Sequence, residues 1–156
     1  SRVFTTNPQL PECPQFGIIR IEGDLYFAAM TYVEEQIAEL YTQKPGQTKL
    51  FITCSAINHM DITGIESLVR IVDQRRKAGG DVFFYDINSR IMRIFEKSRA
   101  LDFIGRDHIF TTKETALESI VPNLDLTICG NCKKRVFWEC DQNKTQYRLK
   151  KQVGDI

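Results

Sequence analysis

Residues 49–80, KLFITCSAINHMDITGIESLVRIVDQRRKAGG, decide the fold of this chain. The run LFIT at 50–53 is almost wholly apolar, which predicts a strand that is covered on both faces. The residues after it are more polar, and we expect a loop over 58–64 that leads into a helix. A strand, a loop and a helix in this order indicate one unit of an α/β fold.

The helix after this loop carries signals for its start, its buried face and its end. Thr63 with Glu66 three residues later matches a capping box, in which both side chains bond backbone N–H groups. The pair Gly79-Gly80 can adopt the left-handed conformation that closes a helix. One apolar face is indicated by the apolar residues at 65, 68, 69 and 72.

Composition excludes several classes of protein. The chain has 156 residues, of which 42% are apolar and 26% charged, as in ordinary globular domains. Its net charge of +1 gives no field that would attract nucleic acid. No apolar run approaches a membrane span and no signal peptide is visible. The chain begins at Ser1 rather than Met, so we expect it to be a piece of a longer protein.

Cysteine usage favours a reducing compartment. The chain holds five cysteines, an odd number, and their spacing is not that of a disulfide framework. Cys54, in or just after a buried strand, is expected to be a small core residue.

The rest of the chain continues the alternation of strands and helices. We expect strands at 17–21, 25–27, 49–53, 81–85 and 108–110, and helices at 31–43, 63–78, 89–98 and 112–121. The other helix starts are marked by Thr31 with Glu34, Asn88 with Ser89, and Thr111 with Glu114. The order predicts an α/β fold with a single mostly parallel or mixed sheet of about five strands and about four helices mainly on one face. The first two strands are expected to form an antiparallel hairpin.

The chain divides into three regions by composition. Residues 1–15 contain three prolines and little pattern, and are expected to be a linker from an upstream part. Residues 16–121 hold the predicted fold. Residues 122–156 form an irregular, basic tail that contains cysteines, with seven Lys and Arg against four Asp and Glu. Its polar stretch 141–151 is expected to be disordered or a weak helix.

Three segments together resemble a STAS domain. They are GIIRIEGDLYFAA at 17–29, NHMDITG at 58–64, and DINSRIMRIFEKSRALDFIGRDHIFTTKETAL at 86–117. More narrowly, they are similar to the STAS domains that SulP-family anion transporters carry on the cytosolic side of the membrane. The resemblance covers residues 16–121, implies a non-catalytic regulatory or interaction domain, and leaves the tail unexplained.

The relatives that this resemblance implies fall into two functional classes. In the anti-sigma factor antagonists, a serine directly after the loop aspartate is phosphorylated by a partner kinase. Here Ile62 follows Asp61, and Thr63 is expected to be the helix cap. This departure favours the domain of a sulfate permease-like transporter at the cytoplasmic face of the bacterial inner membrane. A free-standing antagonist regulated by phosphorylation is the alternative.

The implied partners follow from the transporter class. They are the membrane domain of the same transporter, a second copy of the chain, and a nucleotide or small anion at the loop. Nucleic acid is not expected as a partner.

The candidate binding site is the loop that holds Asn58, His59, Asp61, Thr63 and Gly64. Backbone N–H groups at the helix start would hold an anion or an acidic group of a partner. The alternative is that Asp61 and Thr63 only satisfy these N–H groups as caps. No nucleophile with a base, no Walker loop and no paired carboxylates stand out, so no enzymatic activity is expected.

Cys129, Cys132 and Cys140 form a second candidate site in the tail. Three thiols fall one short of a structural zinc set, and Cys13 from the linker or His108 is the candidate fourth ligand. Zinc is the candidate cofactor of this site. The spacing C-G-N-C also matches a dithiol motif, so a metal- or redox-sensing module is the third functional hypothesis, beside reduced and inert thiols.

An aromatic pair in the tail, Phe137 and Trp138, has no local core to enter. We expect both rings to pack on the domain, on a second copy or on a membrane part.

Overall fold

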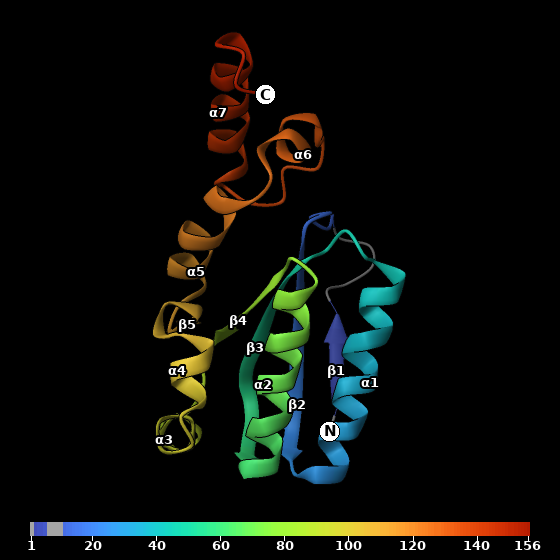
Figure 1. The fold of residues 1–156 in the computed structure, drawn as a ribbon, viewed down its shortest axis with the longest axis vertical. Helices are drawn as coiled ribbons and strands as arrows, with labels where there is room; N and C mark the ends of the chain where they lie inside the picture. The colour runs from blue at the N-terminus through green and yellow to red at the C-terminus, as the bar shows by residue number, and fades with distance from the viewer. Residues whose placement is uncertain (1, 6–10) are drawn as a thin grey trace.

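The computed structural model describes residues 2–5 and 11–156. Its elements are β1 (Arg2–Thr5), β2 (Phe16–Leu25), α1 (Phe27–Gln43), β3 (Lys49–Met60), α2 (Ile62–Lys77), β4 (Asp81–Tyr85), α3 (Ser89–Lys97), α4 (Ala100–Ile104), β5 (Ile109–Phe110), α5 (Lys113–Ile120), α6 (Leu126–Asn131) and α7 (Cys140–Gln152), as Figure 1 shows. Single turns of 3-10 helix lie at Arg106–His108 and Val121–Asn123. Among the described helices, none is both long enough and apolar enough to span a bilayer.

The described strands form one sheet in the order β1-β2-β3-β4-β5. The pairs from β2 to β5 are parallel, and β1 is antiparallel to β2. The predicted fold class, an α/β fold with a mostly parallel sheet, is therefore confirmed.

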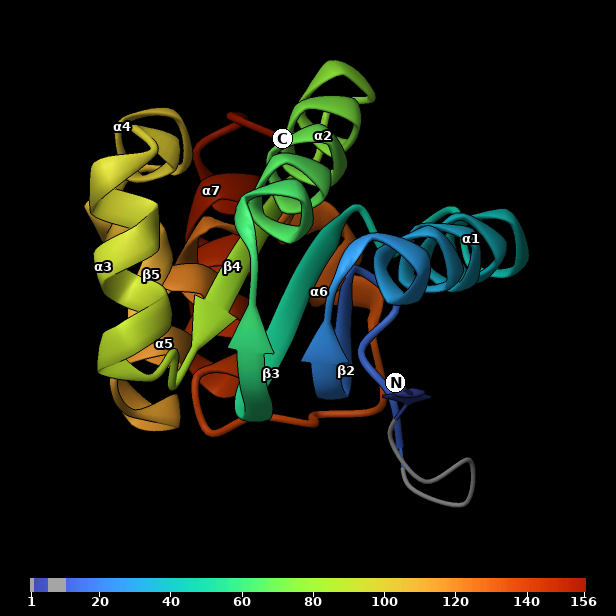
Figure 2. The same cartoon turned by 90° about the horizontal axis from the view of Figure 1, so that it is seen from below.

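The apolar run in β3 is covered on both faces, as predicted. Leu50 and Ile52 enter the larger core, to which α1, α2, α3 and α4 contribute. Phe51 lies between them in sequence and enters the core of the opposite face, because successive side chains of a strand alternate. Figure 2 looks at the carboxyl ends of the strands and shows α1 and α2 on one side of the sheet.

The opposite face carries a smaller core. Phe16 of β2 and Phe51 of β3 stack here with ring centroids 5.8 Å apart. Ala116 and Ile120 of α5 cover them, together with Val121. Covering this face therefore depends on α5 and on the segment that follows it.

The predicted hairpin of strands 17–21 and 25–27 is wrong. Both segments up to Leu25 belong to the single strand β2, which runs parallel to β3 throughout. The register shifts around Gly23, whose φ is 107°, and such irregularities let a strand bend without ending. The glycine therefore marks a bulge rather than a turn.

The antiparallel partner of β2 lies in the segment expected to be a linker. Residues 2–5 form β1, with Val3 opposite Ile21. The expected linker 1–15 thus contains a strand of the sheet, while residues 1 and 6–10 of it lie outside the described part.

Helix starts were predicted with mixed success. Asn88 caps α3 by accepting a hydrogen bond from the Ile91 N–H, as predicted. Helix α5 is capped by Thr112 rather than by Thr111. Helix α1 begins at Phe27, so the predicted capping box at Thr31 is wrong, and the Thr31 hydroxyl donates to the Phe27 carbonyl inside the helix.

The tail is not irregular, because it contains α6 and α7. Of the two expectations for residues 141–151, a helix is confirmed and disorder is wrong. Asp125 caps α6 with its carboxylate. Asn143 of α7 is only 2% exposed and donates to the Val121 carbonyl at 2.8 Å. Figure 1 shows both helices beyond the amino ends of the strands, with α7 projecting from the body of the domain.

The two aromatic residues of the tail behave differently. Phe137 meets the Phe16 ring edge-on at 5.6 Å, so its predicted packing on the domain is confirmed. Trp138 is 97% exposed, so it does not pack on the domain, and its packing on a second copy or on a membrane part stays a prediction.

Candidate functional site

The predicted loop 58–64 is almost absent. Strand β3 continues to Met60, where it pairs with Leu25 at the end of β2. Asp61 is then the only residue between β3 and α2. Asn58 and His59 are exposed residues of the strand, not of a loop.

Asp61, and not Thr63, caps α2. Its backbone is extended (φ −93°, ψ −179°), as a capping residue requires, while Thr63 is already inside the helix. The Asp61 carboxylate accepts the Gly64 N–H at 2.9 Å and the Thr63 hydroxyl at 2.7 Å. The Thr63 hydroxyl and the Gly64 N–H hold the pKa of this carboxyl below its usual range.

Gly64 lets α2 approach the ends of two strands. A Cβ atom at this position would lie 2.5 Å from the Leu25 carbonyl oxygen and 2.8 Å from Met60 Cγ. The structure therefore brings Asp61, Thr63 and Gly64 together as one structural unit. It places Asn58 and His59 beside this unit without a described contact to its side chains.

Three exposed apolar residues lie where α1 and α2 begin. The exposed fractions are 49% for Tyr26, 72% for Phe27 and 49% for Ile62. Both helices start at the carboxyl ends of β2 and β3, at the lower edge of Figure 1. We call these three residues the apolar end. Sequence analysis missed it, because the Tyr26-Phe27 pair was assigned to a strand.

A shallow groove of about 510 Å³ continues from Ile62 along α2. Its walls come from α2 and from the turn into α4, with apolar residues and two arginines, Arg70 and Arg99, among them. Arg70 is paired with Glu34 at 3.0 Å, and Arg99 with Asp102 at 2.7 Å. This surface can contact a protein through apolar side chains, and its charged members are Glu66 and two arginines that are already ion-paired.

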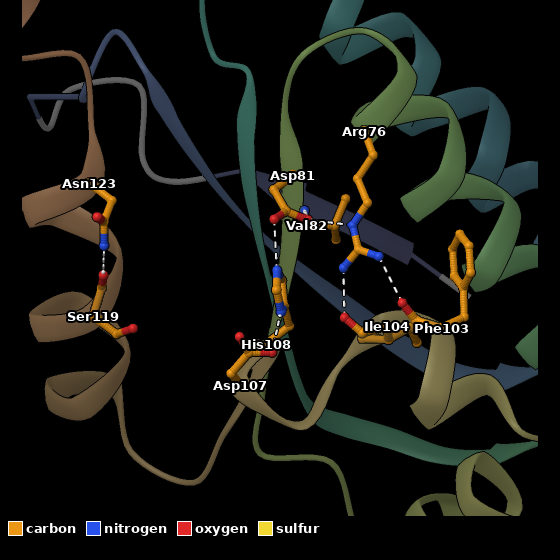
Figure 3. A network of polar contacts seen from close by, with 9 residues as sticks. All are labelled: Arg76, Asp81, Val82, Phe103, Ile104, Asp107, His108, Ser119 and Asn123. Carbon is orange, nitrogen blue, oxygen red and sulfur yellow. Dashed lines mark hydrogen bonds and ion pairs between the residues drawn. The ribbon is translucent and has the colours of Figure 1, made fainter.

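A polar network, which sequence analysis also missed, fixes the far end of α2 (Figure 3). Asp81 at the start of β4 accepts from Arg76 Nε at 2.9 Å and contacts His108 Nε2 at 2.7 Å. Burial opposes the charge of Asp81, but the bonds from Arg76 and His108 outweigh it and hold its pKa below the usual value. Arg76 also donates to the carbonyls of Phe103 and Ile104. Ile104 is the last residue of α4.

His108 is not the fourth ligand of the tail cysteines, because its Nε2 contacts Asp81 and it does not line the pocket that these cysteines share. Its other ring nitrogen lies 2.8 Å from the Asp107 carboxylate, and its ring stacks on Phe83.

The structure brings four of the five cysteines to one small pocket. Cys13, Cys129, Cys132 and Cys140 all line it. Burial raises the pKa of Cys13 to about 11 and also raises that of Cys140, so neither is an activated thiolate of the redox type. The fifth, Cys54, is 3% exposed in the larger core, where burial raises its pKa to about 12.

A family model described as STAS domain matches residues 7–116. "Probable sulfate transporter 3.5" of Arabidopsis thaliana is 27% identical over 124 residues, covering 77% of this chain and 19% of the relative. A probable sulfate transporter of Mycobacterium tuberculosis is 25% identical over 113 residues, covering 72% and 20%. The chain thus spans about a fifth of the length of these curated relatives.

Solved structures with the same fold come from both functional classes. The murine Slc26a9 anion transporter in the inward-facing state matches with a TM-score of 0.63 and 18% identity, over 69% of this chain and 18% of that one. The unphosphorylated anti-sigma factor antagonist SpoIIAA matches at 0.61 and 14%, over 80% of this chain and 100% of that one. A SulP transporter STAS domain from Vibrio cholerae matches at 0.53 and 24%, over 65% and 77%.

Proposed function

This chain belongs to the STAS domain family, and from that premise we propose that it is the regulatory and interaction domain of a SulP-type anion transporter. The domain has no catalytic role in this proposal and works at the cytoplasmic face of a bacterial inner membrane. Its main partner is the membrane domain of the same protein, which carries sulfate or a related anion. The names of the curated relatives, which are sulfate transporters, support this assignment.

The observation that carries the proposal is the start of α2. The residue after Asp61 is Ile62, which has no hydroxyl and is 49% exposed. The nearest hydroxyl, that of Thr63, donates to the Asp61 carboxylate. The phosphate acceptor of the antagonist class is therefore missing, and an apolar side chain stands in its place.

The same helix start favours a protein partner over a bound anion. The Asp61 carboxylate already accepts the Gly64 N–H and adds a negative charge at the positive end of the helix. A second anion would be repelled there. The apolar end, in contrast, exposes three large apolar side chains at the same end of the sheet, as a contact surface does.

Transport by the complete protein tests this proposal. Phe27→Ser and Ile62→Ser, made together in the full-length protein in proteoliposomes, should lower sulfate uptake several-fold at equal protein content. Leu149→Ser, an exposed apolar position in α7 at the opposite end of the domain, is the matched control and should leave uptake unchanged. Equal uptake by all three proteins would contradict a contact between the apolar end and the membrane domain.

The second candidate function is a free-standing anti-sigma factor antagonist. It is favoured by one observation, the match of this fold over 100% of the SpoIIAA chain. Incubation with a kinase of the anti-sigma type, followed by mass spectrometry, distinguishes the two. We expect no phosphate on residues 61–64, and phosphate on Thr63 would favour the antagonist.

A further inference from the structure

The cysteine pocket joins two distant parts of the chain. Cys13 lies just before β2, Cys129 lies in α6, Cys132 ends α6 and Cys140 begins α7. The cavity between them measures about 20 Å³, close to the size of a single water molecule or ion. The pocket lies beyond the amino ends of the strands, at the margin of the smaller core, which contains Cys13 and packs against Cys129.

Backbone N–H groups point at three of the four sulfur atoms. The Cys132 sulfur accepts from the Lys134 N–H at 3.4 Å, and the Cys140 sulfur accepts from the Phe137 N–H at 3.4 Å. The Cys13 sulfur receives the backbone N–H groups of the two residues at 15 and 16. A thiol is a weak acceptor, whereas a thiolate gains from each such bond.

Two buried amide side chains serve the fourth sulfur. Gln15 Nε2 and Asn143 Nδ2 both lie 3.4 Å from Cys129 Sγ. Each amide is held in place by a further bond, from Gln15 to both backbone groups of Asp125 and from Asn143 to the Val121 carbonyl. Such oriented donors around the sulfur are typical of the outer shell of a metal–thiolate site.

Positive charge completes the surroundings. Lys144 and Arg135 line the same pocket. The Lys144 ammonium donates to the carbonyls of Cys129 and Cys132, so it is held beside two of the sulfur atoms. Four thiolates with one divalent cation carry a net charge of −2, which Lys144 would offset in part, while Arg135 is also paired with Asp141 at 3.5 Å.

We propose that Cys13, Cys129, Cys132 and Cys140 bind one zinc ion as a structural four-thiolate site, a role separate from the proposed contact with a membrane domain. A set of four sulfur ligands suits the tetrahedral preference of zinc. Each thiol gives its proton to solvent as its Zn–S bond forms, and no oxidant is needed. Among the described residues, no group of three His, Cys, Asp or Glu side chains is placed so that it could hold a metal ion as it stands. The proposal therefore requires the four thiols to turn toward the pocket as zinc binds.

Metal analysis of the 156-residue chain, purified without chelator, tests the proposal. We expect about one zinc ion per chain. Cobalt in place of zinc should give the sulfur-to-metal charge-transfer absorption of a tetrahedral thiolate site. Cys13→Ser should weaken zinc binding more than about tenfold in competition with a chromogenic chelator. Cys54→Ala, which removes a thiol from the opposite core, is the control and should bind as the unchanged chain does.

Each alternative outcome is distinguishable. Zinc far below one ion per chain with freely titratable thiols, or a non-reduced mass that shows a disulfide, would overturn the site. A zinc affinity of Cys13→Ser equal to that of the unchanged chain would show that Cys13 is not a ligand. If Cys13→Ser is unfolded by circular dichroism, limited proteolysis of the unchanged chain with and without chelator replaces it. Faster cleavage at the tail lysines after zinc removal is then expected, and identical cleavage would contradict the proposal.

Discussion

Asp61 shows how one side chain decides between a binding loop and a structural cap. Asp61 lies between β3 and α2, and its carboxylate accepts hydrogen bonds from Thr63 and Gly64. In the sequence, Thr63 looks like a better cap than Asp61, because Thr63 and Glu66 have the residue types and the spacing of a capping box. What the spacing could not show is that β3 runs on to Met60 and leaves Asp61 alone to make the extended turn.

The first prediction compares the two partners of this cap. Asp61→Ala should lower the free energy of unfolding by about 0.5–2 kcal/mol, since the Gly64 N–H loses its acceptor. Thr63→Val should cost less, because the Asp61–Gly64 bond remains. Urea unfolding followed by circular dichroism measures both. An equal loss in the two variants would mean that Thr63 shares the capping role.

At the scale of elements, the sequence predicted the alternation of strands and helices because each helix has its own apolar period. It missed the pairing of β1, since four residues ahead of a proline-rich stretch carry no pattern that distinguishes an edge strand from a linker. It left α7 undecided between disorder and a weak helix, because that helix is polar on nearly every side and is held by Asn143 and Lys144 through contacts with distant backbone. Tertiary contacts, and not local propensity, decide such elements.

The second prediction concerns the anchoring of α7. Asn143→Ala should cost about 0.5–1.5 kcal/mol, because the Val121 carbonyl loses one of two donors and keeps the Leu124 N–H. Amide exchange should increase in α7 and little in β3. Gln146→Ala, an exposed position of the same helix, is the matched control and should change neither quantity. Unchanged exchange in Asn143→Ala would show that α7 is held by other contacts.

At the scale of the whole molecule, the two candidate sites lie at opposite ends of the sheet. The carboxyl ends of β2 and β3 carry the apolar end, and the amino ends carry the cysteine pocket and the tail. Between them, the Arg76–Asp81–His108 network ties α2, β4 and α4 into one body. This arrangement keeps the two candidate sites apart while the elements that carry them remain rigidly connected.

The third prediction concerns how this network makes the free energy of unfolding depend on pH. The folded-state pKa of Asp81 is lowered, so its contribution to stability is complete above the unfolded value near 3.9 and is lost as pH falls through the folded value. Asp81→Asn should therefore lower the free energy of unfolding by about 1–3 kcal/mol at pH 7. The difference from the unchanged chain should shrink below about pH 4.

Asp73→Asn is the control for this pH series. Its partner Lys77 is 76% exposed, so loss of that surface pair should cost under about 1 kcal/mol at every pH. Urea unfolding between pH 7 and pH 3 gives all three curves. A gap between Asp81→Asn and the unchanged chain that persists in acid would show that the charge of Asp81 is not what stabilises the network.

The pairing of β1 with β2 has a consequence for how the domain behaves in concentrated solution. Removing residues 1–5 would leave β2, ten residues long, as the bare margin of the sheet. Its unpaired N–H and C=O groups would then be a template for strands of other molecules. The shortened chain should form oligomers or fibrils at concentrations where the intact chain scatters little light. The prolines of residues 1–15 suggest a linker that could be removed. The same segment holds β1, which we expect to protect the domain from aggregation.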